Sequence, residues 1–127
     1  MKKIVITGGC GFIGSHIVEH FHKKYPKSKI YVLDKITYAA NIKNLIKIKK
    51  SKRLKIYKTD ILNFQKVKQI TFRADLVIHA AAESHVDNSF NLTNEFIKTN
   101  VIGTKNVLDS CKINKIKKLN EKQTQNH

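Results

Sequence analysis

The stretch MKKIVITGGCGFIGSH, residues 1–16, contains a short apolar run followed at once by three regularly spaced glycines. The run at 3–7 is rich in β-branched residues, which is typical of a buried parallel strand. Gly8, Gly11 and Gly14 follow it, and apolar residues at helical spacing come next. A glycine-rich turn between a strand and a helix is typical of a phosphate-binding turn, because the amino end of the helix offers unpaired N–H groups to an anion.

Each of the three glycines has its own expected role. Gly8 permits the sharp turn, Gly11 lets the backbone approach a pyrophosphate closely, and Gly14 lets the helix lie near the strand. The spacing is G-x-x-G-x-x-G rather than the G-x-G-x-x-G of the commonest dehydrogenases. Any tight turn between a strand and a helix can use three glycines, so the loop alone leaves the functional and the structural interpretation open.

Apolar runs alternate with segments of helical periodicity along the chain. Strands are expected at residues 3–7, 30–33, 54–58 and 75–79. The first helix is expected to begin at residue 13 and to end at Pro26. Further helices are expected at residues 41–50, 63–70 and 93–112. The apolar seam of the last helix is expected to consist of Ile97, Val101, Leu108 and Cys111, with Thr104 on the same stripe. This alternation predicts an α/β fold, a Rossmann-type doubly wound parallel sheet of order 3-2-1-4, truncated after about four strands.

An acidic residue ends the second expected strand. Asp34 comes 20 residues after Gly14, where a carboxylate accepts hydrogen bonds from both hydroxyls of an adenosine ribose. The same carboxylate repels a 2′-phosphate, so the sequence favours NAD over NADP, a preference that Lys35 slightly weakens.

Two further strand ends each allow two interpretations. Asp60 either accepts a hydrogen bond from an adenine amino group, with Ile61 packed on the ring, or is the N-cap of the next helix. Ala80, Ala81 and Ala82 follow the fourth strand. Their small side chains either let the backbone lie against a cofactor or allow tight packing of helix and strand.

Composition bounds the class of protein. The chain has 127 residues, one domain's worth, and a formal net charge of +16. Only Arg53 and Arg73 among its 25 basic residues are arginines, which favours a solvated lysine surface over specific nucleic-acid binding. Cys10 and Cys111 lie far apart without metal-ligand spacing, so we expect free thiols in a reducing cytoplasm. No apolar run approaches the ~20 residues of a membrane span, and we expect neither a membrane partner nor a signal peptide.

Five segments together resemble the extended short-chain dehydrogenase/reductase superfamily, and within it the dTDP-glucose 4,6-dehydratase family. They are TGGCGFIG (7–14), DKITYAAN (34–41), DI (60–61), HAAAESHVDNS (79–89) and KTNVIGT (98–104). The resemblance covers about residues 1–118 and implies a partial NAD-binding Rossmann domain there, followed by a polar, disordered tail at 119–127.

The resemblance also implies which residues contact NAD and substrate. Besides the glycines, Asp34 and the pair at 60–61, these are Phe12 and Ile13 in the pyrophosphate turn, Lys35, Ile36 and Thr37 around the ribose, Ala80, Ala81, Ala82, Glu83 and Ser84 on the nicotinamide side, and Thr99 on the long helix. Ser84 is also implied to touch the sugar nucleotide.

The family reaction is an internal redox cycle on dTDP-glucose, in which water is lost and NAD is regenerated. It uses a Tyr-x-x-x-Lys pair on a helix and an Asp-Glu pair. Tyr31 with Lys35, and Tyr25 with Lys29, match only the spacing. The first pair lies ~13 Å apart along a strand and the second spans the turn at Pro26. The sequence contains no Asp-Glu pair, so we expect no catalytic residue in this chain and no turnover by it alone.

Several functions stay open on the sequence alone. The first is the NAD-binding portion of a dTDP-glucose 4,6-dehydratase of nucleotide-sugar and cell-surface polysaccharide biosynthesis, a lyase that is a homodimer in the full-length family. The others are a sugar-nucleotide epimerase, a dehydratase of another sugar nucleotide, a non-catalytic NAD-binding module that complements a partner chain, and a lysine-rich nucleic-acid binder. The polar carboxyl end favours a truncated product or a remnant partnered by a second polypeptide, and predicts that the fourth strand has an open apolar edge.

Overall fold

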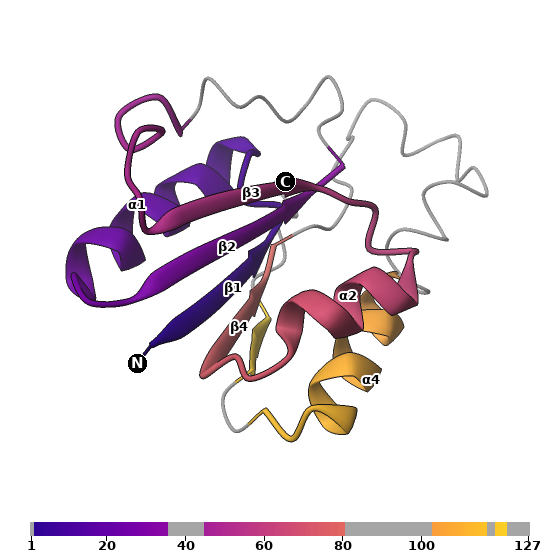
Figure 1. Ribbon diagram of the computed structural model, residues 1–127. Helices are drawn as coiled ribbons and strands as arrows, with labels where there is room; N and C mark the ends of the chain where they lie inside the picture. Colours follow the sequence, from indigo (N-terminus) through magenta and orange to yellow (C-terminus); the bar gives the residue numbers. More distant parts are fainter. Residues whose placement is uncertain (1, 36–44, 81–102, 117–118, 122–127) are drawn as a thin grey trace, which may run out of the picture.

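The computed structural model describes residues 2–35, 45–80, 103–116 and 119–121 (Figure 1). Its elements are, in chain order, β1 (Lys3–Thr7), α1 (Phe12–Lys24), β2 (Lys29–Asp34), β3 (Leu54–Lys58), α2 (Phe64–Thr71), β4 (Leu76–His79), α4 (Thr104–Ile113) and β5 (Leu119–Glu121). Strands β1 to β4 and helices α1 and α2 agree with the strands and helices expected there from the sequence to within a few residues.

All strands belong to one parallel sheet of order β3-β2-β1-β4-β5. β1 is central: Ile4 lies beside Ile30 of β2 on one side and beside Leu76 of β4 on the other. The expected order 3-2-1-4 is confirmed. Because the strands are parallel, their carboxyl ends lie at one edge of the sheet, where ligands bind in folds of this type.

The sheet contains one strand more than expected. In β5, Leu119 lies beside Val77 and Glu121 lies beside His79 of β4. The expectation that β4 has an open edge is therefore wrong over this register, and residues 119–121 form a strand, not a disordered tail. The expectation rested on side-chain polarity, whereas a strand at a sheet edge pairs through its backbone. Residues 122–127 lie outside the described part of the chain.

Both faces of the sheet carry an apolar cluster, as is usual for parallel sheets. Because successive side chains of β1 point to opposite faces of the sheet, Ile4 and Ile6 belong to one cluster and Val5 to the other. The first cluster packs the sheet against α1 through Val18. The second packs it against α2 and α4, which lie together on one side of the sheet (Figure 1), and includes Val107 of α4.

Two helix expectations need correction. Residues 45–50, the described half of the helix expected at 41–50, form turns: Ile48 N donates to Leu45 O (3.0 Å) and Ser51 N donates to Ile48 O (2.9 Å). In α4, Cys111 is buried as expected, but Leu108 is 40% exposed and Val107 is buried in its place, so the expected seam is wrong at Leu108. The rest of the expected helix at 93–102, with Ile97 and Val101, lies outside the described residues.

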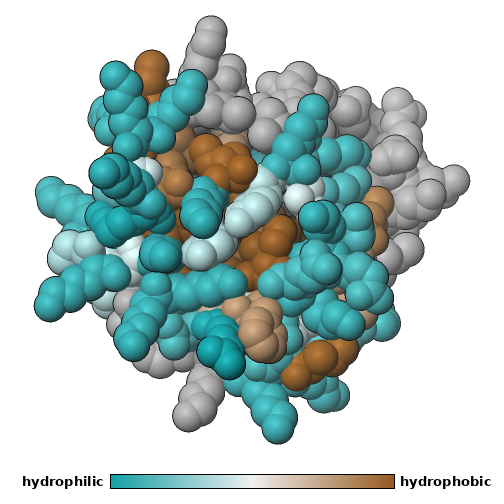
Figure 2. Space-filling view, viewed as in Figure 1, coloured by the Kyte–Doolittle hydropathy of each residue, from teal (hydrophilic) through white to brown (hydrophobic). Residues whose placement is uncertain are grey.

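The lysine excess lies at the surface in the part of the chain that the structure describes. No lysine of these segments is buried. Figure 2 shows a face on which hydrophilic residues predominate and surround smaller apolar areas. The expectation of a solvated lysine surface is confirmed for these segments.

Arg53, just before β3, joins the end of α1 to the loop that leads into β2. Its Nη1 donates to the carbonyls of Tyr25 (3.1 Å) and Ser28 (2.8 Å), and its Nη2 donates to the carbonyl of His22 (2.9 Å). We expect Arg53→Met to lower the free energy of unfolding by about 2 kcal/mol, because three carbonyls lose a charged donor. Urea denaturation checks this, with the exposed neighbour in Lys52→Met as control. Equal losses in the two variants would contradict the role of Arg53.

Candidate functional site

Gly8 and Gly14 form the tight part of the glycine turn between β1 and α1. Gly8 has a φ of 72°, in the left-handed region that favours glycine, and its N–H donates to Leu33 O of β2 (2.7 Å). A Cβ added at Gly14 would lie 1.9 Å from Gly8 O. The fold therefore requires glycine at both positions, as the sequence predicts.

Gly9 and Gly11 differ in what the protein requires of them. A Cβ at Gly9 would lie 2.6 Å from a methyl of Val32 and 2.9 Å from one of Val18, so this glycine, to which the sequence analysis gave no role, is also structural. At Gly11, φ is −73° and an added Cβ would lie 3.4 Å from Gly8 O, an ordinary contact. The fold therefore does not require glycine at position 11.

The amino end of α1 faces the same turn. Gly11 is the N-cap, and no side chain caps the helix there. Phe12, the first helical residue, is 73% exposed, and Ile13 follows it half-buried. The first N–H groups of α1 thus meet the turn at an end of partial positive charge, which suits an anion.

Asp34 ends β2 and is held against the glycine turn. The side chain is only 7% exposed, and its Oδ2 accepts a hydrogen bond from the backbone N–H of Cys10 (2.8 Å). Burial, and then the charge of Asp34, raise the pKa of the buried Cys10 thiol to about 12, so that it stays neutral at physiological pH. The structure therefore brings the predicted acid and the predicted glycine turn together.

Asp60 forms a turn after β3. Its Oδ1 accepts from the N–H of Leu62 (2.9 Å), its carbonyl accepts from Asn63 N (2.9 Å), and its Oδ2 lies 3.7 Å from Lys35 Nζ. The N-cap of α2 is Asn63, whose side chain accepts from Lys66 N (3.2 Å). The interpretation of Asp60 as that N-cap is therefore wrong.

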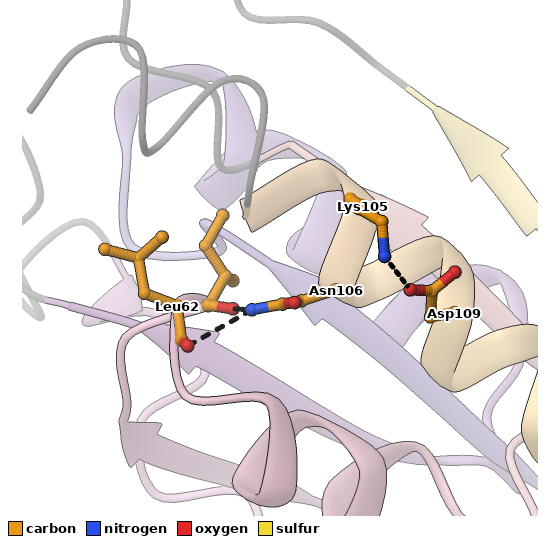
Figure 3. A network of polar contacts seen from close by, with 5 residues as sticks. Leu62, Lys105, Asn106 and Asp109 are labelled. Carbon is orange, nitrogen blue, oxygen red and sulfur yellow. Dashed lines mark hydrogen bonds and ion pairs between the residues drawn. The ribbon is translucent and has the colours of Figure 1, made fainter. Parts of the chain in front are cut away.

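Asn106 of α4 bonds to the turn that follows β3, as Figure 3 shows. Its Nδ2 donates to the carbonyls of Ile61 (2.9 Å) and Leu62 (3.1 Å). The Ile61 side chain is 5% exposed and leaves no room for a Cβ at Gly103, which would lie 2.4 Å from its Cδ1. Asn106 is not among the site residues predicted from the sequence, because a polar residue next to Lys105 in a helix is expected to face solvent.

A buried polar chain joins β1, β4 and α4. His79 Nδ1 lies 2.6 Å from Thr7 Oγ1, and His79 Nε2 lies 3.0 Å from Thr104 Oγ1. Ala80 N donates to the Thr7 carbonyl (3.0 Å) and lies 3.2 Å from its Oγ1. Burial lowers the pKa of His79, which is 4% exposed, to about 4. The first turn of α4 is thereby fixed to the ends of the two central strands.

The described candidates thus gather at the carboxyl edge of the sheet. Seven predicted site residues lie outside the described part of the chain: Ile36, Thr37, Ala81, Ala82, Glu83, Ser84 and Thr99. Within the described ranges, no group of three or more acidic, histidine or cysteine side chains is placed to hold a metal ion. Among those same segments there is also no helix with the length and apolar character that crossing a membrane requires.

Comparison with known proteins gives consistent results. The family model for GDP-mannose 4,6 dehydratase matches residues 5–125. The dTDP-D-glucose 4,6-dehydratase of Dictyostelium discoideum is 46% identical over 120 residues, which cover 93% of this chain and 28% of that protein. The dTDP-glucose 4,6-dehydratase of Neisseria meningitidis is 39% identical, with coverages of 88% and 32%.

Solved structures agree. The dTDP-glucose 4,6-dehydratase of Streptomyces venezuelae, crystallised with NAD bound, superimposes with a TM-score of 0.85 at 34% identity, over 92% of this chain and 38% of that one. A UDP-Glc/GlcNAc 4-epimerase of Campylobacter jejuni gives a TM-score of 0.83 at 28% identity, over 95% and 36%. The chain spans about a third of the length of these relatives. Because the family model matches nearly the whole of it, the chain belongs to the GDP-mannose 4,6-dehydratase family.

Proposed function

We propose that this chain forms the NAD-binding part of a sugar-nucleotide 4,6-dehydratase. The observation that carries the proposal is the glycine turn, where the fold requires glycine at positions 8, 9 and 14 but not at Gly11. At Gly11 the backbone is open enough for a molecule to lie against the turn, and the amide of the neighbouring Cys10 holds Asp34 there. The relatives that match this chain include dehydratases, one of them crystallised with NAD.

The residues present fit a dinucleotide. The uncapped amino end of α1 and the bare backbone at Gly11 suit the pyrophosphate, with Phe12 and Ile13 in the same turn. Asp34, which the Cys10 amide holds in place, suits the adenosine ribose. Asp60 at the end of β3 suits the adenine amino group. When bound, NAD supplies the site with a hydride acceptor and donor.

The remaining contacts are proposed from the family resemblance. They are Lys35, Ile36 and Thr37 around the ribose, Ile61 near the adenine, Ala80, Ala81, Ala82 and Glu83 on the nicotinamide side, Thr99, and Ser84 toward both cofactor and sugar nucleotide. The proposed substrate of the whole enzyme is dTDP-glucose, converted to dTDP-4-keto-6-deoxyglucose by a cytoplasmic homodimeric lyase. Since these 127 residues contain no Asp-Glu pair, the proposed activity of this chain alone is cofactor binding without turnover.

The substitution Asp34→Asn tests the proposal. Asparagine keeps an oxygen that accepts from Cys10 N, so the turn stays anchored, but it removes the charge that favours the ribose hydroxyls and repels a 2′-phosphate. We expect the affinity for NAD to fall about ten-fold and the preference for NAD over NADP to disappear, since a hydrogen bond to a charged group contributes ~1.5–3 kcal/mol. Isothermal titration calorimetry with both dinucleotides measures this.

The matched control is Asp109→Asn. It removes a carboxylate that pairs with Lys105 on the surface of α4, away from the glycine turn, and is expected to leave the NAD affinity unchanged. Thermal melts of all three proteins verify that each is folded. The proposal is wrong if the folded wild-type chain binds no NAD, or if Asp34→Asn binds NAD and NADP as the wild-type chain does.

A further inference from the structure

One peptide unit connects α4 to the carboxylate of Asp60. The carbonyl of the peptide between Ile61 and Leu62 accepts from Asn106 Nδ2 at 2.9 Å. The N–H of the same peptide donates to Asp60 Oδ1, also at 2.9 Å. Because a peptide is planar and rigid, fixing its carbonyl fixes the direction of its N–H. The two bonds also polarise each other, which strengthens both.

The Asn106 amide is committed to this turn. Its Nδ2 makes a second bond to Leu62 O (3.1 Å), so two successive carbonyls of the turn share one donor group. The adjacent ion pair of Lys105 Nζ and Asp109 Oδ2 (2.6 Å) joins two residues of α4 itself (Figure 3). On α4, therefore, Asn106 bonds to the loop after β3, whereas its neighbour Lys105 pairs with Asp109 of the same helix.

The helix itself is firmly placed. Thr104, two residues before Asn106, lies 3.0 Å from the buried His79 ring at the end of β4. The space at Gly103 is filled by the side chain of Ile61. The position of the Asn106 amide is therefore set by the central strands, and through it the turn at Asp60 is set relative to the glycine turn.

We propose that Asn106 is a positioning residue for adenine recognition: through the 61–62 peptide it aims the Asp60 carboxylate at the amino group of the adenine base. This inference rests on the proposed NAD-binding function. Among the described residues, the ammonium group of Lys35 faces this carboxylate, with its Nζ 3.7 Å from Asp60 Oδ2. Without Asn106 the peptide is free to turn, and the carboxylate loses its fixed direction while its charge and its ion pair remain.

The expected signature is a change in base selectivity. An aimed carboxylate accepts a hydrogen bond from the amino group of adenine but repels the carbonyl that hypoxanthine carries at the same position. We expect the wild-type chain to bind NAD at least ten-fold more tightly than nicotinamide hypoxanthine dinucleotide. In Asn106→Ala this ratio is expected to fall below about three-fold, mainly through weaker binding of NAD.

Calorimetric titration of both dinucleotides into wild type, Asn106→Ala and Lys105→Ala performs the test. If the role of Asn106 is purely structural, replacing it reduces the folded fraction of the protein. Both apparent affinities then fall by the same factor, and their ratio stays unchanged. Lys105→Ala, at the neighbouring exposed position, is expected to keep the wild-type ratio. Asn106→Gln, which restores the amide on a longer arm, is expected to recover part of it.

Asn106→Ser keeps one hydroxyl donor at this part-buried position and replaces Asn106→Ala if that variant does not fold. An unchanged ratio in the folded Asn106 variant overturns the inference and leaves NAD binding intact. A wild-type chain that binds NAD without discriminating between the two bases overturns it as well. A folded wild-type chain that binds no NAD overturns the proposed function, and the inference with it.

Discussion

Alanine at Gly14 is expected to prevent stable folding, whereas alanine at Gly11 is expected to leave the fold intact and remove most of the affinity for NAD. At Gly14 the new Cβ would lie 1.9 Å from Gly8 O and 2.8 Å from Gly8 C, both backbone atoms. Gly8 is held in place, because its N–H donates to Leu33 O (2.7 Å) and its carbonyl accepts from Gly11 N (3.2 Å). We expect a loss of more than about 4 kcal/mol, within the exceptional class for a single substitution.

In contrast to Gly14→Ala, the substitution Gly11→Ala creates no clash with the backbone. Its φ of −73° suits alanine, and the new Cβ meets only Gly8 O, at 3.4 Å. Replacing glycine by alanine at an N-cap costs less than about 1 kcal/mol. A bound pyrophosphate has to approach this backbone closely, so we expect the NAD affinity to fall at least ten-fold, about 1.4 kcal/mol or more.

Urea denaturation followed by circular dichroism, and calorimetric titration of NAD, separate the two effects. The control is Gly9→Ala, whose Cβ would meet methyl groups of Val32 and Val18 rather than backbone, so that its loss of stability should lie between those of the other two variants. A Gly14→Ala protein as stable as wild type would contradict the described turn geometry. A Gly11→Ala protein with wild-type NAD affinity would contradict the position proposed for the pyrophosphate.

The parts of this site that were predictable from sequence are those that a residue type dictates locally. Gly8 takes a backbone conformation that other residues rarely adopt, and Asp34 ends a strand at a fixed distance from the turn. The strand order followed from the doubly wound fold that alternating strands and helices predict, with right-handed crossovers. Each of these features depends on short stretches of chain and on general rules of handedness.

The parts that sequence reasoning missed depend on tertiary placement. α4 buries Val107 in place of Leu108, and it packs closely through Gly103 on Ile61, a residue more than 40 positions earlier. Asn106 acquires its role only because that packing brings it to the turn after β3. Pairing of β5 with β4 uses backbone groups, which the polarity of the sequence does not reveal.

The free energy of unfolding is expected to decrease between about pH 6.5 and pH 4 because of His79. Burial lowers its pKa from 6.5 to about 4 in the folded chain, so between these values the unfolded chain binds a proton that the folded chain does not. The stabilisation is complete above pH 6.5 and is lost as the pH falls toward 4. A shift of this size corresponds to a loss on the order of 3 kcal/mol. Urea titrations at half-unit intervals of pH measure it.

The hydrogen bonds of His79 explain why stability is lost at low pH. The cause is the burial of a charge, not the breaking of contacts. Both of its partners, Thr7 and Thr104, are hydroxyls that accept from a protonated ring as readily as they bond to a neutral one. What opposes the proton is therefore desolvation in a site that is 4% exposed. His79→Gln keeps a donor toward Thr104. We expect this variant to be less stable than wild type at pH 7, and its free energy of unfolding to depend much less on pH between 6.5 and 4.

His20→Gln, at an exposed position on α1, serves as the control and should keep the full slope. His22 adds a smaller decrease of the same sign, because burial and the Arg53 charge also lower its pKa. The pKa of Asp75 is lowered by hydrogen bonds from the N–H groups of Lys3 and Lys2, so its stabilising effect is lost only as the pH falls below about 4. If His79→Gln shows the wild-type slope between pH 6.5 and 4, the buried ring is not the group that titrates.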